Sequence, residues 1–138
     1  MVRTSGVAMM ERPVTELMTG LSRRRRRAIL GQMSRAAMPA GRLLTQEGAT
    51  GREFFVLTGG RVEVCVHGEP VAEVEPGDFF GEISLLRGCP RTATVVASDD
   101  VTLEVMNRRE FAAVLDLWPS LARSVSERAI QRLVALEN

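Results

Sequence analysis

The segment FGEISLLRGCPRTATV, Phe80 to Val95, decides how the rest of the chain is interpreted. It places a carboxylate, Glu82, directly after a glycine and an arginine, Arg91, nine positions later, and the apolar run between them is too short to be a stable helix alone. The first turn of a short helix over Glu82–Leu86 would offer unpaired backbone N–H groups, which attract an anion. Arg91 would bring a guanidinium fork that suits two oxygens of one phosphate. The segment therefore predicts a phosphate site.

Glu82 is the unexpected member of that site, because a carboxylate repels a phosphate. It fits when the ligand carries a hydroxyl next to its phosphate, since a carboxylate accepts an O–H strongly. A phosphate with an adjacent ribose hydroxyl indicates a nucleotide. On spacing alone, an ordinary ion pair between Glu82 and Arg91 explains the two charges equally well.

The composition excludes several classes of protein. The 138 residues include 18 Lys and Arg against 17 Asp and Glu, so the net charge of +1 gives no overall attraction to nucleic acid or to anionic membranes. No stretch approaches the length of an apolar membrane span, and the N-terminus lacks the apolar core of a signal sequence. The two cysteines, Cys65 and Cys89, suit a reducing compartment. We therefore expect a single cytoplasmic domain.

The only histidine, His67, argues against most catalytic chemistry. Its surroundings, VHGEP, indicate a turn between two apolar runs. With one His and two scattered Cys, the sequence offers no zinc ligand set and no Ser/His/Asp or Cys/His grouping. We expect no metal, no cofactor and no enzymatic activity.

The chain divides into a flexible arm over residues 1–12 and three structural segments. Residues 13–37 follow a helical pattern interrupted near Gly20, with Ser22 as the predicted N-cap of the second helix. Residues 38–107 contain short apolar runs between turns, and RVEVCV and VTLEV alternate as half-buried strands do. Residues 108–137 are helical again, with Pro119 in the first turn of their second helix. This order predicts a mainly β domain, a small antiparallel sandwich or barrel with flanking helices.

FGEISLLRGCPRTATV resembles the phosphate-binding cassette of cyclic-nucleotide-binding domains, the family of catabolite activators and protein-kinase regulatory subunits. The shared pattern is Phe-Gly-Glu, an apolar helical turn, and Pro-Arg-(Ser/Thr/Ala)-Ala-Thr-Val, and every element is present in order. The resemblance covers nearly the whole chain and implies a jelly-roll barrel (a double-stranded β-helix) with N-terminal helices and a C-terminal lid helix. Two departures stand out. Gly51-Arg52-Glu53 replaces the family's frequent Gly-Asp, and with no Tyr and only one Trp, Trp118, we do not expect the base to stack on a C-terminal aromatic side chain.

The resemblance also implies ligand contacts. Glu82 would bind the ribose 2′-hydroxyl, Arg91 would bind the cyclic phosphate, and backbone amides at Gly81, Glu82 and Thr92 would add contacts. Arg132 in the last helix would either lie over the purine or remain a solvated surface arginine. The predicted ligand-binding residues are Phe80, Gly81, Glu82, Ile83, Ser84, Arg91, Thr92, Ala93 and Arg132.

The sequence thus predicts a regulatory module that binds a 3′,5′-cyclic nucleotide and signals by movement of its C-terminal helix. The arginine-rich composition fits a bacterial source, which favours cAMP over cGMP, although Thr92 by itself favours cGMP. An effector domain or protein partner is expected, and no helix-turn-helix, kinase, cyclase, channel or membrane segment is recognisable. Two alternatives remain: a degenerate fold used only for protein contact, and a basic nucleic-acid-binding protein acting through Arg23–Arg27.

Overall fold

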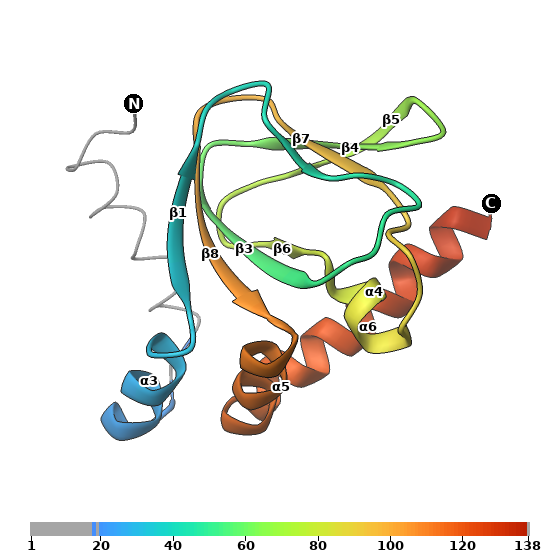
Figure 1. The fold of residues 1–138 in the computed structure, drawn as a ribbon. Helices are drawn as coiled ribbons and strands as arrows, with labels where there is room; N and C mark the ends of the chain where they lie inside the picture. The colour runs from blue at the N-terminus through green and yellow to red at the C-terminus, as the bar shows by residue number, and fades with distance from the viewer. Residues whose placement is uncertain (1–17, 19, 138) are drawn as a thin grey trace.

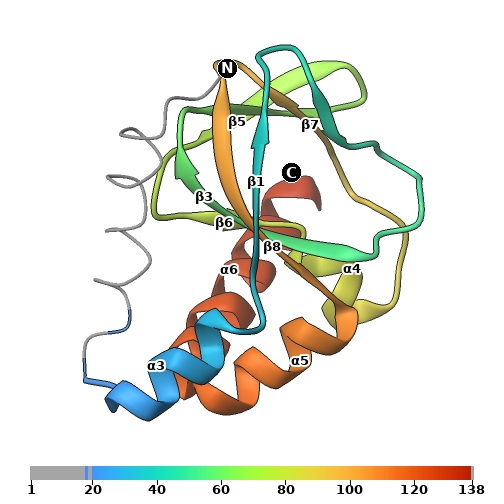
Figure 2. The same ribbon diagram turned by 60° about the vertical axis from the view of Figure 1, so that its left-hand side comes forward.

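The computed structural model describes Met18 and residues 20–137, so the predicted arm over residues 1–12 lies outside the described residues. Within the described part, two four-stranded antiparallel sheets have the strand orders β1-β8-β3-β6 and β2-β7-β4-β5. The strands curl round a common interior, with α3 and α5 at one end and α6 running from that end along the barrel (Figures 1 and 2). The predicted antiparallel barrel with flanking helices is confirmed. The strands are β1 (Ser34–Met38), β2 (Leu43–Thr45), β3 (Glu53–Gly59), β4 (Val62–Val66), β5 (Glu69–Val74), β6 (Phe79–Phe80), β7 (Thr94–Ala97) and β8 (Val101–Asn107).

The barrel interior is filled by apolar side chains from both sheets. β3 is buried along nearly its whole length, because it pairs with β8 on one side and with β6 on the other. Its Leu57 is fully buried together with Val62 and Leu103. Each such side chain contributes about 1.5–3 kcal/mol by leaving water. The barrel is therefore the rigid part on which the loops are mounted.

The helices are α3 (Arg23–Leu30), α4 (Glu82–Arg87), α5 (Arg108–Leu117) and α6 (Pro119–Glu137). Local signals set where three of the helices begin. For α3, the Ser22 side chain accepts a hydrogen bond from the N–H of Arg25, and for α5, Asn107 forms a capping box with Glu110. Pro119 is the first residue of α6. The N-cap at Ser22 and the position of Pro119 are as predicted.

A second buried cluster joins the helices to the barrel. Phe54 of β3 packs on Phe111 of α5 with ring centroids 4.4 Å apart, and Val125 of α6 is fully buried in the same cluster. Trp118, between α5 and α6, is also buried there. This cluster fixes the position from which α6 starts.

The sequence predicted two helical pieces within residues 13–37. The first lies largely outside the described residues, and the second is wrong at its C-terminal end. α3 ends at Leu30, and residues Ser34–Met38 form β1. The register of β1 against β8 runs from Ser34 opposite Val105 to Met38 opposite Val101. Alanine has the highest intrinsic helix propensity, but propensity is a weak preference for any residue, and pairing with the buried strand β8 outweighs it.

Candidate functional site

A cavity of about 650 Å³ lies between the barrel and α6. One wall is apolar and comes from β4, β5 and β7, including Val64, Val74 and Val95. The opposite end is formed by the segment that begins at Phe80. All nine residues predicted to bind ligand line this cavity, so the structure brings them together: Phe80, Gly81, Glu82, Ile83, Ser84, Arg91, Thr92, Ala93 and Arg132.

Gly81 allows the chain to turn from β6 into α4. Its φ of +92° lies in the left-handed region, and a Cβ there would lie 2.9 Å from both Nη1 of Arg91 and the carbonyl oxygen of Glu53. Any larger residue would therefore be strained and would displace the arginine. α4 then forms over Glu82–Arg87, where the sequence predicted a short helix.

Gly51 is a second close approach, in the loop where the sequence departs from the family pattern. A Cβ on Gly51 would lie 2.6 Å from Cβ of Ser84 and 2.9 Å from Nε of Arg91. The loop is therefore packed directly against the site at Gly51, despite its departure from the family's Gly-Asp pattern.

Arg91 is buried, with 8% of its surface exposed, and backbone groups hold it in place. Its Nη1 donates to the carbonyl of Gly81 (3.0 Å), its Nη2 donates to the carbonyl of Glu53 (2.7 Å), and its guanidinium lies 5.8 Å from the centre of the Phe55 ring. Burial lowers the pKa of Arg91 below its usual value, and the negative charges of Glu53 and Glu82 offset part of that effect. Guanidinium groups stay protonated in proteins, so Arg91 is a fixed positive charge.

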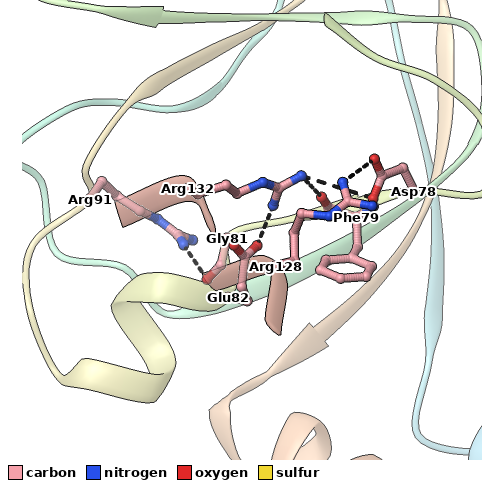
Figure 3. A network of polar contacts seen from close by, with 7 residues as sticks. All are labelled: Asp78, Phe79, Gly81, Glu82, Arg91, Arg128 and Arg132. Atoms are coloured by element: carbon pink, nitrogen blue, oxygen red, sulfur yellow. Dashed lines mark hydrogen bonds and ion pairs between the residues drawn. The ribbon is translucent and has the colours of Figure 1, made fainter. Parts of the chain in front are cut away.

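Glu82 does not pair with Arg91. Its side chain is 1% exposed, and its Oε1 accepts from Nη1 of Arg132 at 2.6 Å (Figure 3). Its Oε2 is buried and has no hydrogen-bond partner among the described residues. In the described part of the chain Arg91 forms no ion pair, so the alternative of a simple Glu82–Arg91 pair is wrong.

Two arginines of α6 hold that helix against the loop before α4. Nη1 of Arg128 lies 2.8 Å from Oδ2 of Asp78, and Nη2 of Arg132 donates to the carbonyl of Phe79 at 2.9 Å. Both guanidinium groups also lie over the Phe79 ring, at 5.7 Å and 5.5 Å from its centre. Figure 3 shows these side chains converging from α6 onto the segment Asp78–Glu82. Arg132 is therefore engaged with the site instead of being solvated.

The sequence analysis missed part of the site. Asp78, Arg128 and Gln131 line the cavity, as do the valines of β4 and β5. The valines could have been found from the alternation of β4, which places Val64 and Val66 on one face. Arg128 lies one turn before Arg132, but nothing in the sequence pairs it with Asp78, fifty residues away.

Metal and membrane features are absent from the described residues. No group of three or more His, Cys, Asp or Glu there could hold a metal ion. None of the helices in the described ranges is long and apolar enough to span a membrane. Cys65 and Cys89 are both free thiols.

Comparison with known proteins identifies relatives of this fold. A cyclic nucleotide-gated potassium channel of Rhizobium etli is 35% identical over 95 residues, 69% of this chain and 26% of the channel. The Catabolite Activator Protein of Thermus thermophilus superposes with a TM-score of 0.74 at 26% identity, over 88% of this chain and 59% of that one. The regulatory domain of Toxoplasma gondii PKA, crystallised with cAMP, gives a TM-score of 0.66 at 27% identity, over 83% of this chain and 46% of that one. The chain spans about a quarter to a third of the length of the curated relatives it matches.

The family model of the cyclic nucleotide-binding domain matches residues 35–117. This range begins in β1, ends with α5 and includes the whole of Phe80–Val95. The family is a regulatory one, and its fold agrees with the barrel and the flanking helices described above. The chain belongs to the cyclic nucleotide-binding domain family.

Proposed function

We propose that the cavity binds a 3′,5′-cyclic nucleotide, with cAMP preferred over cGMP, and that the domain is regulatory and not catalytic. The observation that carries this proposal is an unsatisfied carboxylate oxygen next to a buried arginine that has no ion pair among the described residues, both at one end of the cavity. Oε2 of Glu82 is a buried acceptor without a partner, and Arg91 is a buried cation without a carboxylate partner in the described part of the chain. A ligand with a hydroxyl next to a phosphate satisfies both groups.

The cyclic phosphate would lie against Arg91, which keeps N–H donors beyond the two given to backbone carbonyls. The ribose 2′-hydroxyl would donate to Oε2 of Glu82, leaving Oε1 to Arg132. The base would then extend toward the apolar wall that contains Val64 and Val74, beneath α6. Apolar walls with a few placed polar groups are typical of small-molecule sites.

The preference for cAMP rests on the acceptors around the base. Guanine presents a ring N–H and an amino group on one edge, and a carboxylate is the strongest acceptor for them. The α6 residues that line the cavity, such as Gln131 and Arg132, include no carboxylate, and the carboxylate of Glu73, which lines the cavity from β5, pairs with Arg61 at 3.8 Å. In this arrangement the hydroxyl of Thr92 would donate a hydrogen bond to the phosphate and would not contact the base.

Signalling would follow from the position of α6. Its Arg132 shares the Glu82 carboxylate with the proposed ligand, so ligand binding and the position of α6 are coupled through one side chain. A ligand that binds best beneath α6 shifts the population toward that arrangement. A cytoplasmic effector domain or partner would respond to the helix.

The test is calorimetric titration of the purified chain with cAMP, cGMP and AMP. We expect cAMP to bind most tightly and AMP, which lacks the cyclic phosphate, most weakly. A folded protein that binds none of the three would overturn the proposal and favour a degenerate domain used for protein contact.

A further inference from the structure

α3 is the most strongly charged element of the molecule. Its first five residues, Arg23–Arg27, are consecutive arginines, and all of them are exposed. The other 13 Lys and Arg of the chain stand against 17 Asp and Glu, so α3 is a basic helix on an otherwise acidic molecule. The distribution is far more uneven than the net charge of +1 suggests.

The charges of α3 are not neutralised within the described residues. The helix has no acidic residue in its first turn, where arginines meet the positive end of the helix dipole. Arg23 and Arg27 are also like charges four residues apart, which destabilises a helix. No ion pair to any of the five arginines is present in the described ranges, and the one side-chain hydrogen bond among them runs from Arg26 to the carbonyl of Leu21. An anionic surface that binds α3 would relieve this repulsion.

The molecule carries such a surface at its opposite end. Residues 62–77, which contain β4 and β5, include Glu63, Glu69, Glu73 and Glu75 and no Lys or Arg. Glu69, Glu73 and Glu75 are exposed. Glu73 pairs with Arg61 at 3.8 Å, whereas Glu69 and Glu75 have no ion pair among the described residues. We call residues 62–77 the acidic hairpin.

The acidic hairpin and α3 of one molecule are too far apart to meet. Figures 1 and 2, which view the molecule from directions 60° apart, both place β5 at one end and α3 at the other. Each surface also carries an exposed apolar side chain, Leu30 (43% exposed) at the end of α3 and Val71 (58%) in β5. The two surfaces are therefore complementary in charge, and each adds an apolar contact.

We propose that α3 binds the acidic hairpin of a second copy of this chain. Because the two surfaces differ, the contact is heterologous, and a pair of molecules keeps one free α3 and one free acidic hairpin. Association therefore proceeds to rings or open chains instead of stopping at a symmetric dimer. A long polyanion such as nucleic acid is a poorer occupant, since the rest of the molecule repels it and α3 offers no aromatic side chain for base stacking.

Sedimentation measured over a range of protein concentrations tests the proposal, at about 50 mM and about 500 mM NaCl, because salt screens exposed charges. At low salt the average mass of the wild-type chain should rise by about twofold or more with concentration, as a non-closing contact requires. At high salt it should remain that of the monomer. A wild-type chain that stays monomeric at low salt overturns the proposal, and so does a duplex oligonucleotide that binds α3 while the protein alone stays monomeric.

Charge reversal identifies the two surfaces. One variant carries Arg24→Glu and Arg25→Glu, and the other carries Glu69→Arg and Glu75→Arg. Each should be monomeric alone, because the changes reduce the charge of Arg23–Arg27 from +5 to +1 or that of the acidic hairpin from −4 to 0. An equimolar mixture should associate again, because the unchanged acidic hairpin of the first variant meets the unchanged α3 of the second. A control with Arg42→Glu and Arg123→Glu, both exposed arginines outside the two surfaces, has the same charge change as the first variant and should associate like the wild type.

Two results would contradict the assignment: reversed variants that associate as the wild type does, or a mixture that stays monomeric. Circular dichroism of every variant establishes that the fold is retained. Binding of cAMP serves as a separate readout, because neither variant changes the residues proposed to bind its phosphate or ribose. A chain that associates as expected but binds no nucleotide would contradict only the proposed function.

Discussion

Glu82 binds Arg132, fifty residues away in α6, and not Arg91, which lies in its own segment. The two buried charged residues of this segment therefore have different roles. Arg91 is held by two backbone carbonyls and is the proposed phosphate ligand, whereas the Glu82 carboxylate connects the site to α6. The following predictions test these roles.

Replacing Arg91 by alanine should remove most cyclic-nucleotide binding. Loss of one member of a desolvated charge pair costs about 2–5 kcal/mol, which is about 30-fold to several thousand-fold in Kd. The fold should persist with lower stability, because the carbonyls of Gly81 and Glu53 lose their donor. Calorimetry measures the affinity, and Arg87→Ala, an exposed arginine of α4, is the matched control. Unchanged affinity in Arg91→Ala would remove the phosphate assignment.

Replacing Glu82 by alanine should weaken binding of cAMP more than binding of 2′-deoxy-cAMP, because both ligands lose the hold of Glu82 on Arg132 and only cAMP also loses the acceptor of its 2′-hydroxyl. The carboxylate has no other proposed partner on the ligand, and the deoxy analogue lacks the hydroxyl that it would accept. Titrating the wild type and the variant with both nucleotides gives four affinities, which form a double cycle. The cycle isolates the contact between the Glu82 carboxylate and the 2′-hydroxyl. Equal losses for the two ligands would show that Glu82 acts only through Arg132 and the structure.

Deleting Arg128–Asn138 should keep the barrel folded and accelerate release of the nucleotide. The deletion removes the contacts of Arg128 and Arg132 but leaves Arg91 and α4 intact. Dissociation of a fluorescent cAMP analogue, followed by stopped-flow, gives the rate directly. A truncated chain that releases ligand as slowly as the intact one would remove α6 from the mechanism.

Replacing Gly81 by alanine should destabilise the protein and impair binding together. The positive φ costs about 1 kcal/mol for a residue with a Cβ, and displacement of Arg91 adds to it. Gly68 is the matched control, because its φ of +80° is also positive but a Cβ there meets nothing within 4 Å. Both Gly81→Ala and Gly68→Ala should have a lower Tm than the wild type in thermal unfolding, and only Gly81→Ala should lose affinity for cAMP. If both variants keep full affinity, the contact between Gly81 and Arg91 does not position the arginine for ligand.

Selectivity between cAMP and cGMP should not exceed about tenfold. The difference between the bases rests on about one hydrogen bond, worth about 0.5–1.5 kcal/mol. Titration of Thr92→Ala with both nucleotides checks the contribution of the Thr92 hydroxyl. The ratio of the affinities for cAMP and cGMP should change little when this hydroxyl is removed. A strong preference for cGMP that Thr92→Ala erases would reverse the choice of base.

The local parts of the site could be predicted from the sequence, because their geometry depends on neighbouring residues. The turn at Gly81, the short helix after it and the position of Arg91 follow from one continuous segment. Contacts between distant segments could not be predicted in this way. β1 depends on pairing with β8, and the partner of Glu82 lies at the far end of the chain.

The ring of Phe79 contacts Arg128 and Arg132 of α6 but does not line the cavity. It belongs to the buried cluster that joins the helices to the barrel. Repacking of that cluster would therefore move Arg128 and Arg132 without replacing Glu82 or Arg91. Mutations in the hydrophobic core could adjust the ligand concentration at which the domain responds, while the chemistry of recognition stays the same. Related domains could in this way acquire different working ranges before any of their binding residues changed.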